Sequence, residues 1–379
     1  MERCRQLSLG NWRNFVAADA VFEDRAFIVG PNASGKSNLL DALCFLADLV
    51  AVGGGFQEAV RRRGGLAGIR SSASATDADV TIRTFWESGD GGDWEYSLTF
   101  GGHDDGTLVV KAETVRRGGA GDALLDRPND DDRADPQRLT QTHLEQVQVN
   151  QRFRRLAEFF AAIRYVHIVP QIVRASNRSG ESHFAEFGEG LIDAIASTPA
   201  TTRLARLRRV RNILRVAIPG LSDLDVSRDK HGAAHLRARF GEGRASMAWQ
   251  DERLLSDGTV RLAGLLWALL DGTGLILLEE PESSLHSALV RYLPQMLHRA
   301  QRLTGRQVFM TAHSPILFSD GGIGLDEVFL MQPTIEGSLV SRAKDFDDIR
   351  HQVEAGIPLA DILTARTAPA DVQRFALLP

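Results

Sequence analysis

Residues 30–37 read Gly30-Pro31-Asn32-Ala33-Ser34-Gly35-Lys36-Ser37, which is the pattern G-x-x-x-x-G-K-[ST] of a phosphate-binding loop. An apolar run at 25–29 precedes this stretch, and apolar residues at helical spacing follow it from 39 to 50. This order of strand, loop and helix is the context that the pattern requires. We therefore predict that residues 30–38, including Asn38, surround phosphate groups, that Lys36 reaches the terminal phosphates, and that Ser37 holds Mg²⁺.

The composition is that of a globular protein and excludes several classes of function. With a net charge of −5 over 379 residues, any contact with nucleic acid must come from a local patch. Two cysteines, Cys4 and Cys44, are too few for a disulfide framework or a zinc cluster. The longest strongly apolar stretch, 262–270, is shorter than the roughly 20 residues of a membrane helix. We expect a cytoplasmic protein without a membrane span.

Working outward from the loop, we predict a single α/β domain over 1–379. The N-terminal lobe, 1–115, holds the loop and three segments of alternating polarity, and 116–140 is rich in Gly, Asp, Pro and Arg. We predict a flexible acidic loop there. An insertion lobe at 150–250 should contain a helix, a buried strand, further helices and three alternating segments, at 153–163, 165–169, 188–216 and 221–249. The C-terminal lobe, 251–379, returns to alternating helices and strands.

A second motif combines an apolar strand with carboxylates. Residues 275–278 read Leu-Ile-Leu-Leu and are followed by Glu279-Glu280-Pro281-Glu282. Ligands bind beyond the carboxyl ends of strands in open α/β sheets, so these acids should face the phosphate loop. We assign Mg²⁺ binding to Glu279 and orientation or deprotonation of the attacking water to Glu280. The alternative is that both are merely solvated residues at the start of a helix.

Two shorter motifs are weaker when each is taken alone. Ser256, Asp257 and Gly258 form a small polar turn before an apolar helix at 260–270, a pattern that is also typical of an ordinary helix cap. His313 follows a predicted strand at 307–310 and should lie at the same edge of the sheet, although an isolated histidine is usually structural.

The order of these four motifs resembles that of the ABC-type ATPases of the RecF, SMC and OLD group, and the similarity extends from Leu7 to about Met331. The resemblance implies the P-loop NTPase fold of an ABC-ATPase head, with an antiparallel β subdomain and a helical insertion. It also implies that ATP and Mg²⁺ bind and that two chains close on two ATP molecules. Ser256 and Gly258 would then complete the site of the opposite subunit, and His313 would approach the γ-phosphate.

The same resemblance suggests Gln171, after the predicted strand at 165–169, as a further ligand near Mg²⁺ and the water; a surface glutamine is the alternative. Two positions depart from the group's usual pattern. Asp257-Gly258 stands where two glycines are common, and Glu279 stands where aspartate is most frequent. The Asp257-Gly258 variant resembles that of RecF-like and OLD-like members. The Glu-Glu-Pro-Glu and His-Ser-Pro forms are similar to those of bacterial ATPases of overcoming-lysogenization and phage-defence systems.

Spacing narrows the choice within the group. Transporter subunits place roughly half as many residues between the phosphate loop and the serine–glycine turn as this chain places between Ser37 and Ser256. SMC proteins carry long coiled-coil arms, and no heptad run that could form such arms is present here. Only residues 314–379 follow His313, so we expect no OLD-type nuclease domain. We expect a compact head that acts in DNA maintenance or anti-phage defence with a separate effector protein, such as a nuclease. A nucleotide-sensing scaffold with little hydrolysis is the rival.

One predicted helix, 203–215, is rich in arginine. Its polar side carries Arg203, Arg206, Arg208, Arg209, Arg211 and Arg215, opposite a stripe of Leu204, Leu207, Val210 and Leu214. A solvated helix face explains this pattern, and contact with a DNA backbone is the other interpretation.

Overall fold

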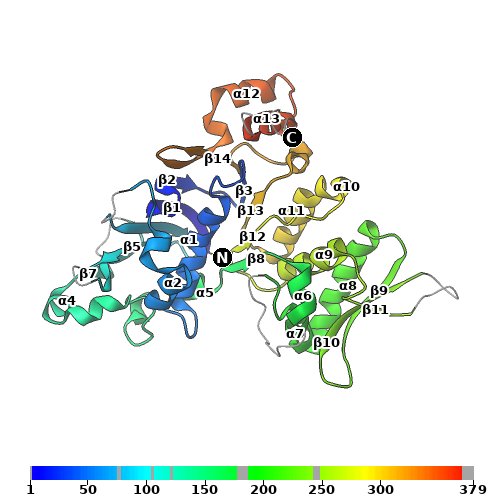
Figure 1. The fold of residues 1–379 in the computed structure, drawn as a ribbon, viewed down its shortest axis with the longest axis horizontal. Helices are drawn as coiled ribbons and strands as arrows, with labels where there is room; N and C mark the ends of the chain where they lie inside the picture. The colour runs from blue at the N-terminus through cyan, green and yellow to red at the C-terminus, as the bar shows by residue number, and fades with distance from the viewer. Residues whose placement is uncertain are drawn as a thin grey trace, which may run out of the picture.

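The structure is a computed structural model that describes residues 2–74, 78–103, 106–119, 123–176, 187–241 and 248–368. A central sheet of six strands runs through the molecule (Figure 1). In spatial order it consists of β15 (Gly337–Arg342), β14 (Val328–Thr334), β3 (Arg25–Val29), β13 (Val308–Ala312), β12 (Ile276–Leu278) and β8 (Arg164–Val166). The strands from β14 to β8 are parallel, and only β15 pairs antiparallel.

Both faces of this sheet are buried, which explains why its strands read as continuous apolar runs. Along β3, Phe27 and Val29 enter one hydrophobic core, while Ala26 and Ile28 enter another on the opposite face. The strands β12 and β13 alternate in the same way. The predicted strands at 25–29 and 275–278 are therefore found in place, at the middle of the sheet.

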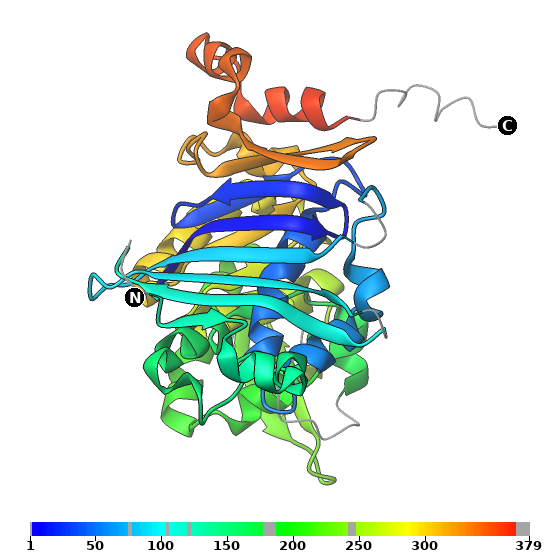
Figure 2. The ribbon, with the colours of Figure 1, turned by 90° about the vertical axis from the view of Figure 1, so that its left-hand side faces the viewer.

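A second, antiparallel sheet covers one side of the molecule (Figure 2). Its order is β2 (Phe15–Val21), β1 (Arg3–Trp12), β4 (Val80–Glu87), β5 (Trp94–Gly102), β6 (Leu108–Arg117) and β7 (Leu125–Arg127). The three alternating segments predicted at 80–115 are β4, β5 and β6. Helix α1 (Lys36–Val50) contributes its apolar face to the core between the two sheets, and three shorter helices join it there: α2 (Phe56–Arg62), α3 (Gly65–Ile69) and α5 (Arg154–Ala161).

The helical lobe packs on the other face of the central sheet (Figure 1). It contains α6 (Pro170–Ser176), α7 (Leu191–Ser197), α8 (Ala200–Ala217), α9 (Asp257–Leu270), α10 (Ser287–Val290) and α11 (Leu293–Thr304), with a small sheet of β9 (Leu221–Arg228), β10 (Ala234–Phe240) and β11 (Gln250–Asp251). Part of the predicted alternating region at 221–249, residues 242–247, lies outside the described residues. The chain continues through two 3-10 turns, Pro315–Ser319 and Ala343–Asp345, to α12 (Asp347–Glu354) and α13 (Leu359–Thr367).

Two expectations about local structure were wrong. The strand predicted at 165–169 ends at Val166, because Pro170 begins α6 soon afterwards, and proline is favoured in the first turn of a helix. The flexible acidic loop predicted at 116–140 contains β7, α4 (Asp130–Ala134) and a 3-10 turn over Pro136–Thr140. Its polar composition was misleading, because Arg127 and Asp132 are buried and pair with each other.

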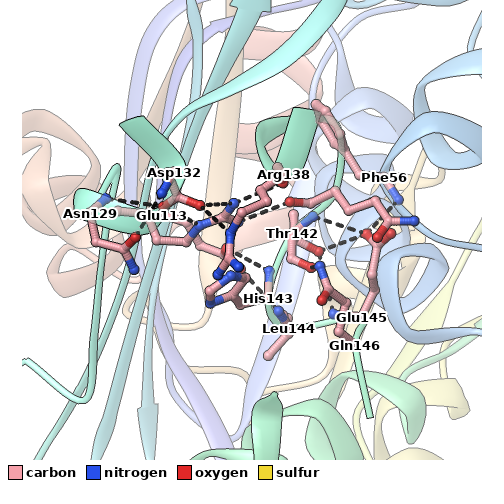
Figure 3. A network of polar contacts seen from close by, with 12 residues as sticks. Phe56, Glu113, Asn129, Asp132, Arg138, Thr142, His143, Leu144, Glu145 and Gln146 are labelled. Carbon is pink, nitrogen blue, oxygen red and sulfur yellow. Dashed lines mark hydrogen bonds and ion pairs between the residues drawn. The ribbon is translucent and has the colours of Figure 1, made fainter. Parts of the chain in front are cut away.

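A buried ionic network holds this segment (Figure 3). The Arg127 guanidinium pairs with Glu113 at 3.0 Å and with Asp132 at 2.9 Å, and all three side chains have 0% exposure. Glu113 also accepts hydrogen bonds from the backbone N–H groups of His143 and Leu144. The network therefore ties β6 and β7 to the following chain, and one buried guanidinium pairs with two buried carboxylates.

Within the described part of the chain, no helix combines the length and the apolar character that crossing a membrane requires.

Replacing Arg127 by methionine should destabilise the protein by about 3–5 kcal/mol, because the buried carboxylates of Glu113 and Asp132 lose the guanidinium that pairs with both, and only Asp132 keeps a second partner, Arg138. Urea unfolding followed by circular dichroism measures this change. Arg133→Ala is the matched control, since the Arg133–Asp130 pair lies on the surface and its loss should matter little. Equal stability of the Arg127 variant and the control would contradict a structural role for the network.

Candidate nucleotide-binding site

The motifs predicted to carry chemistry meet at one edge of the central sheet. Strands β3, β13 and β12 are parallel neighbours, so their carboxyl ends open on the same side. The phosphate loop follows β3, Glu279 and Glu280 follow β12, and His313 follows β13. A cavity of about 400 Å³ lies there, lined by Asn32, Ala33, Gly35, Lys36, Ser37, Asn38, Glu280 and His313.

Asn14, which the sequence analysis missed, braces the phosphate loop from behind. Its amide donates to the Ser34 carbonyl at 3.0 Å, and its oxygen accepts from the Asn38 amide at 2.8 Å. Gly35 has φ +93°, and a Cβ there would lie 2.0 Å from the Asn14 amide nitrogen. The loop therefore needs glycine at Gly35 for its conformation and for space.

Lys36 is 5% exposed and donates to the carbonyls of Gly30 and Pro31, each at 3.0 Å. Burial lowers the pKa of its ammonium group, while the carboxylates of Glu280 and Glu279 oppose that shift. The ammonium group is thus held at the mouth of a loop that also presents a helix N-terminus. This arrangement suits a polyphosphate, because the loop carbonyls that accept from Lys36 carry no full negative charge and a bound phosphate would supply one.

Ser37 and Glu279 form the oxygen-rich part of the site. The Ser37 hydroxyl donates to the Glu279 carboxylate, and the Tyr165 hydroxyl lies 3.3 Å from its other oxygen. Burial raises the pKa of Glu279. Among the described residues, no group of three or more His, Cys, Asp or Glu side chains is arranged to hold a metal. The hydroxyl and carboxylate fit Mg²⁺, which binds through few protein ligands together with phosphate and water.

Glu280 occupies a strained position, with φ +42°. Its carboxylate accepts from the Ser283 hydroxyl at 3.2 Å and pairs with Nε2 of His313 at 2.8 Å. Its backbone N–H donates to the Thr311 hydroxyl on β13 at 3.1 Å. The structure therefore places Glu280 and His313 in direct contact at the edge of the cavity.

Glu282, to which the sequence analysis assigned no role, orients the segment that carries His313. One oxygen accepts from the backbone N–H groups of His313 at 2.6 Å and Ser314 at 3.3 Å. Glu282 is 5% exposed, and burial raises the pKa of its carboxyl group. The sequence analysis noted Glu282 as part of the pattern Glu-Glu-Pro-Glu. The pattern does not reveal that this carboxylate binds the distant backbone of His313 and Ser314.

Ser256 and Gly258 lie at the start of α9, apart from this cavity. The Ser256 hydroxyl accepts from the Thr259 N–H at 3.2 Å, which is the geometry of a helix cap. Neither residue is among the described residues that line the cavity. Ser256 is exposed, so the turn is open to another molecule.

The predicted metal ligand Gln171 also lies against this turn. Its amide donates to Asp257 at 3.1 Å, while Arg174 pairs with Asp257 at 2.7 Å and donates to the Leu255 carbonyl at 2.8 Å. The hydrogen bond that Gln171 makes is therefore to the turn before α9, and Ser37 and Glu279 contact each other without it. Its assignment as a Mg²⁺ ligand remains a prediction without geometric support.

Comparison with known proteins identifies relatives. A family model described as "AAA domain, putative AbiEii toxin, Type IV TA system" matches residues 25–319. A "DNA replication and repair protein RecF" from Acaryochloris marina (strain MBIC 11017) is 32% identical over 114 residues, covering 30% of this chain. The match spans only 27% of the length of that relative.

Two solved SMC heads share the fold. A SmcHead bound to the C-winged helix domain of ScpA superposes with a TM-score of 0.55 at 14% identity, covering 89% of this chain and 96% of the other. A Smc head with an extended coiled coil, bound to the C-terminal domain of ScpA derived from Pyrococcus furiosus, gives 0.52 at 14% identity, covering 93% and 100%. The chain therefore belongs to this AAA-domain family, and its fold is that of the ABC-type ATPase heads of the RecF and SMC group.

Proposed function

We propose that the protein binds and hydrolyses ATP as a molecular switch, in a homodimer that encloses two ATP molecules. The observation that carries this proposal is the convergence of Lys36, Glu280 and His313 on one cavity at the ends of three adjacent strands. Hydrophobic packing does not explain why these three polar side chains meet, because none of them fills a hydrophobic core.

Each residue has a distinct role in the proposed reaction. The loop N–H groups and Lys36 bind the β- and γ-phosphates, and bound Mg²⁺, held by Ser37 and Glu279, would offset phosphate charge. Glu280 orients the attacking water and accepts its proton, because its carboxylate faces the cavity from a fixed backbone position. His313 holds the Glu280 carboxylate and presents its ring to the cavity.

The position of the turn formed by Ser256, Asp257 and Gly258, the signature turn, supports the proposed dimer. Ser256 and Gly258 are exposed or half-buried at the N-terminus of a 14-residue helix, where backbone N–H groups favour an anion. Since they do not line the cavity of their own chain, we propose that they approach the γ-phosphate bound by a second copy. Each active site would then contain residues of two chains.

The relatives support a setting for this switch. A match to a protein named for DNA replication and repair, and a family described by a toxin–antitoxin system, favour DNA maintenance or anti-phage defence. A separate effector protein, such as a nuclease, would then act on the state of the dimer. The rival function, a scaffold with little turnover, is favoured by one observation: the Glu280 carboxylate is already occupied by Ser283 and His313. Steady-state hydrolysis with and without DNA separates the two.

Glu280→Gln should convert the protein into a stable dimer with ATP and Mg²⁺, because the amide keeps the shape of the side chain but cannot accept the proton. Size-exclusion chromatography with light scattering measures this, and wild type should return to a looser state as ATP is consumed. Adding Ser256→Arg should abolish the dimer, since a bulky side chain fills the place of the partner's phosphate.

The matched control is Ser72→Arg, which places the same cation at another exposed serine and should leave the dimer intact. Hydrolysis at the wild-type rate by Glu280→Gln would show that another group is the base. A dimer that ignores nucleotide and Ser256→Arg would exclude the shared active site.

The arginine-rich helix gives limited support to DNA binding. Arg203 donates to two backbone carbonyls, Arg206 pairs with Asp271, and Arg211 pairs with Asp223. Leu204, expected in the apolar stripe, is 58% exposed. Arg208 and Arg209 are exposed, and neither forms an ion pair with a described residue. Much of the predicted basic face therefore serves to attach α8 to its neighbours.

We expect that Arg208→Glu with Arg209→Glu lowers the salt dependence of DNA binding by about two released counterions, since these two exposed arginines form no ion pair with a described residue. Fluorescence anisotropy of a labelled duplex over a range of salt concentrations measures the slope. Arg133→Glu, on another exposed helix, controls for net charge. An unchanged salt slope in the double variant would contradict a DNA contact through Arg208 and Arg209.

A further inference from the structure

Arg261 on helix α9 is buried, and two of its three guanidinium nitrogens have no hydrogen-bond partner among the described residues. It is 9% exposed, and the two nitrogens are its Nε and Nη1 atoms. Burial lowers the pKa of its guanidinium group, and the carboxylates of Glu280, Asp257 and Glu282 oppose the shift. A buried, unpaired cation is costly, so its retention calls for an explanation in another state of the molecule.

The three carboxylates near Arg261 differ in whether they have an oxygen without a hydrogen-bond partner. The Glu280 carboxylate already contacts Ser283 and His313. That of Asp257 contacts Arg174 and Gln171. Glu282 uses only one oxygen, and its Oε2 is buried with no hydrogen-bond partner in the described part of the chain. An unpaired buried cation and an unpaired buried carboxylate oxygen therefore face the same region.

The first turn of α9 packs directly on the loop that carries Glu282. A Cβ on Gly258 would lie 2.9 Å from the Ser284 carbonyl oxygen, so the helix and the loop touch there. Arg261 is three residues after Gly258, which places it on the same side of the helix. Glu280 and Ser284 both have positive φ, at +42° and +65°. A loop that is strained at both ends is suited to take a second arrangement.

We propose that Arg261 is a positioning residue that pairs with Oε2 of Glu282 when ATP is bound. The pair would fix the segment of His313, because the other oxygen of Glu282 holds the His313 and Ser314 N–H groups. Since α9 begins at the turn that meets the partner's ATP, occupation of one active site would set the catalytic geometry of the other. This inference rests on the proposed shared site.

The test compares Arg261→Met, Glu282→Gln and the double variant, with Arg261→Lys as the conservative change. Thermal unfolding is measured without nucleotide and with ATP and Mg²⁺, and turnover is measured alongside. Because the pair is absent without nucleotide, Arg261→Met should not lower the melting temperature of the nucleotide-free protein. Arg261→Met should reduce the increase in melting temperature that ATP and Mg²⁺ cause. It should also lower kcat by about tenfold with little change in KM.

Glu282→Gln should reduce the ATP-induced rise by a similar amount, the double variant should lose no more, and Arg261→Lys should restore part of it. Failure of Arg261→Met to fold, or an equal loss without nucleotide, would show a purely structural role and overturn the proposal. Additive losses with Glu282→Gln, or non-additive losses with Glu280→Gln instead, would also overturn it. If wild type hydrolyses no ATP but the variants still show the expected changes in melting temperature with ATP, only the proposed hydrolysis is refuted. The proposed pairing of Arg261 with Glu282 would then stand.

Discussion

The parallel pairing of β3 with β13 and of β13 with β12 is the constraint on which the site depends. These strands are buried on both faces, so most of their side chains are apolar, and the charged residues of the site lie beyond their carboxyl ends. Parallel direction brings those ends to one edge. The phosphate loop, the paired carboxylates and the histidine are thus neighbours, although almost 300 residues separate the first from the last.

Several residues at this edge of the sheet have energetically unfavourable conformations or environments. Positive φ at Glu280 and Ser284, a glycine with no space for a Cβ at Gly35, and a buried lysine that faces carbonyls all concentrate there. Such features persist only where the surrounding structure holds them. Asn14 from the antiparallel sheet and Thr311 from β13 provide that support, so both halves of the fold contribute to one cavity.

Much of this arrangement could be predicted from the sequence, because its signals are local. The loop motif, the apolar strand before Glu279 and the cap at Ser256 each depend on a few adjacent residues. What could not be predicted depends on distant partners. The polar composition of 116–140 does not reveal that Arg127 is buried between Glu113 and Asp132, and the position of Gln171 after a predicted strand does not reveal its hydrogen bond to Asp257. Asn14 belongs to no motif, and only the folded loop reveals its function.

The central claim is that each active site combines the phosphate loop of one chain with the signature turn of another. Mixing Lys36→Ala with Ser256→Ala, which removes the hydroxyl without adding the bulk that would break the dimer, tests it most directly, with steady-state ATP hydrolysis as the readout. A mixed dimer contains one site with an intact Lys36 from one chain and an intact Ser256 from the other. We predict that activity returns on mixing at equal concentrations, to about a quarter of wild type if dimers form at random and sites act independently. No recovery, under conditions in which the two chains are shown to exchange, would contradict a site shared between chains.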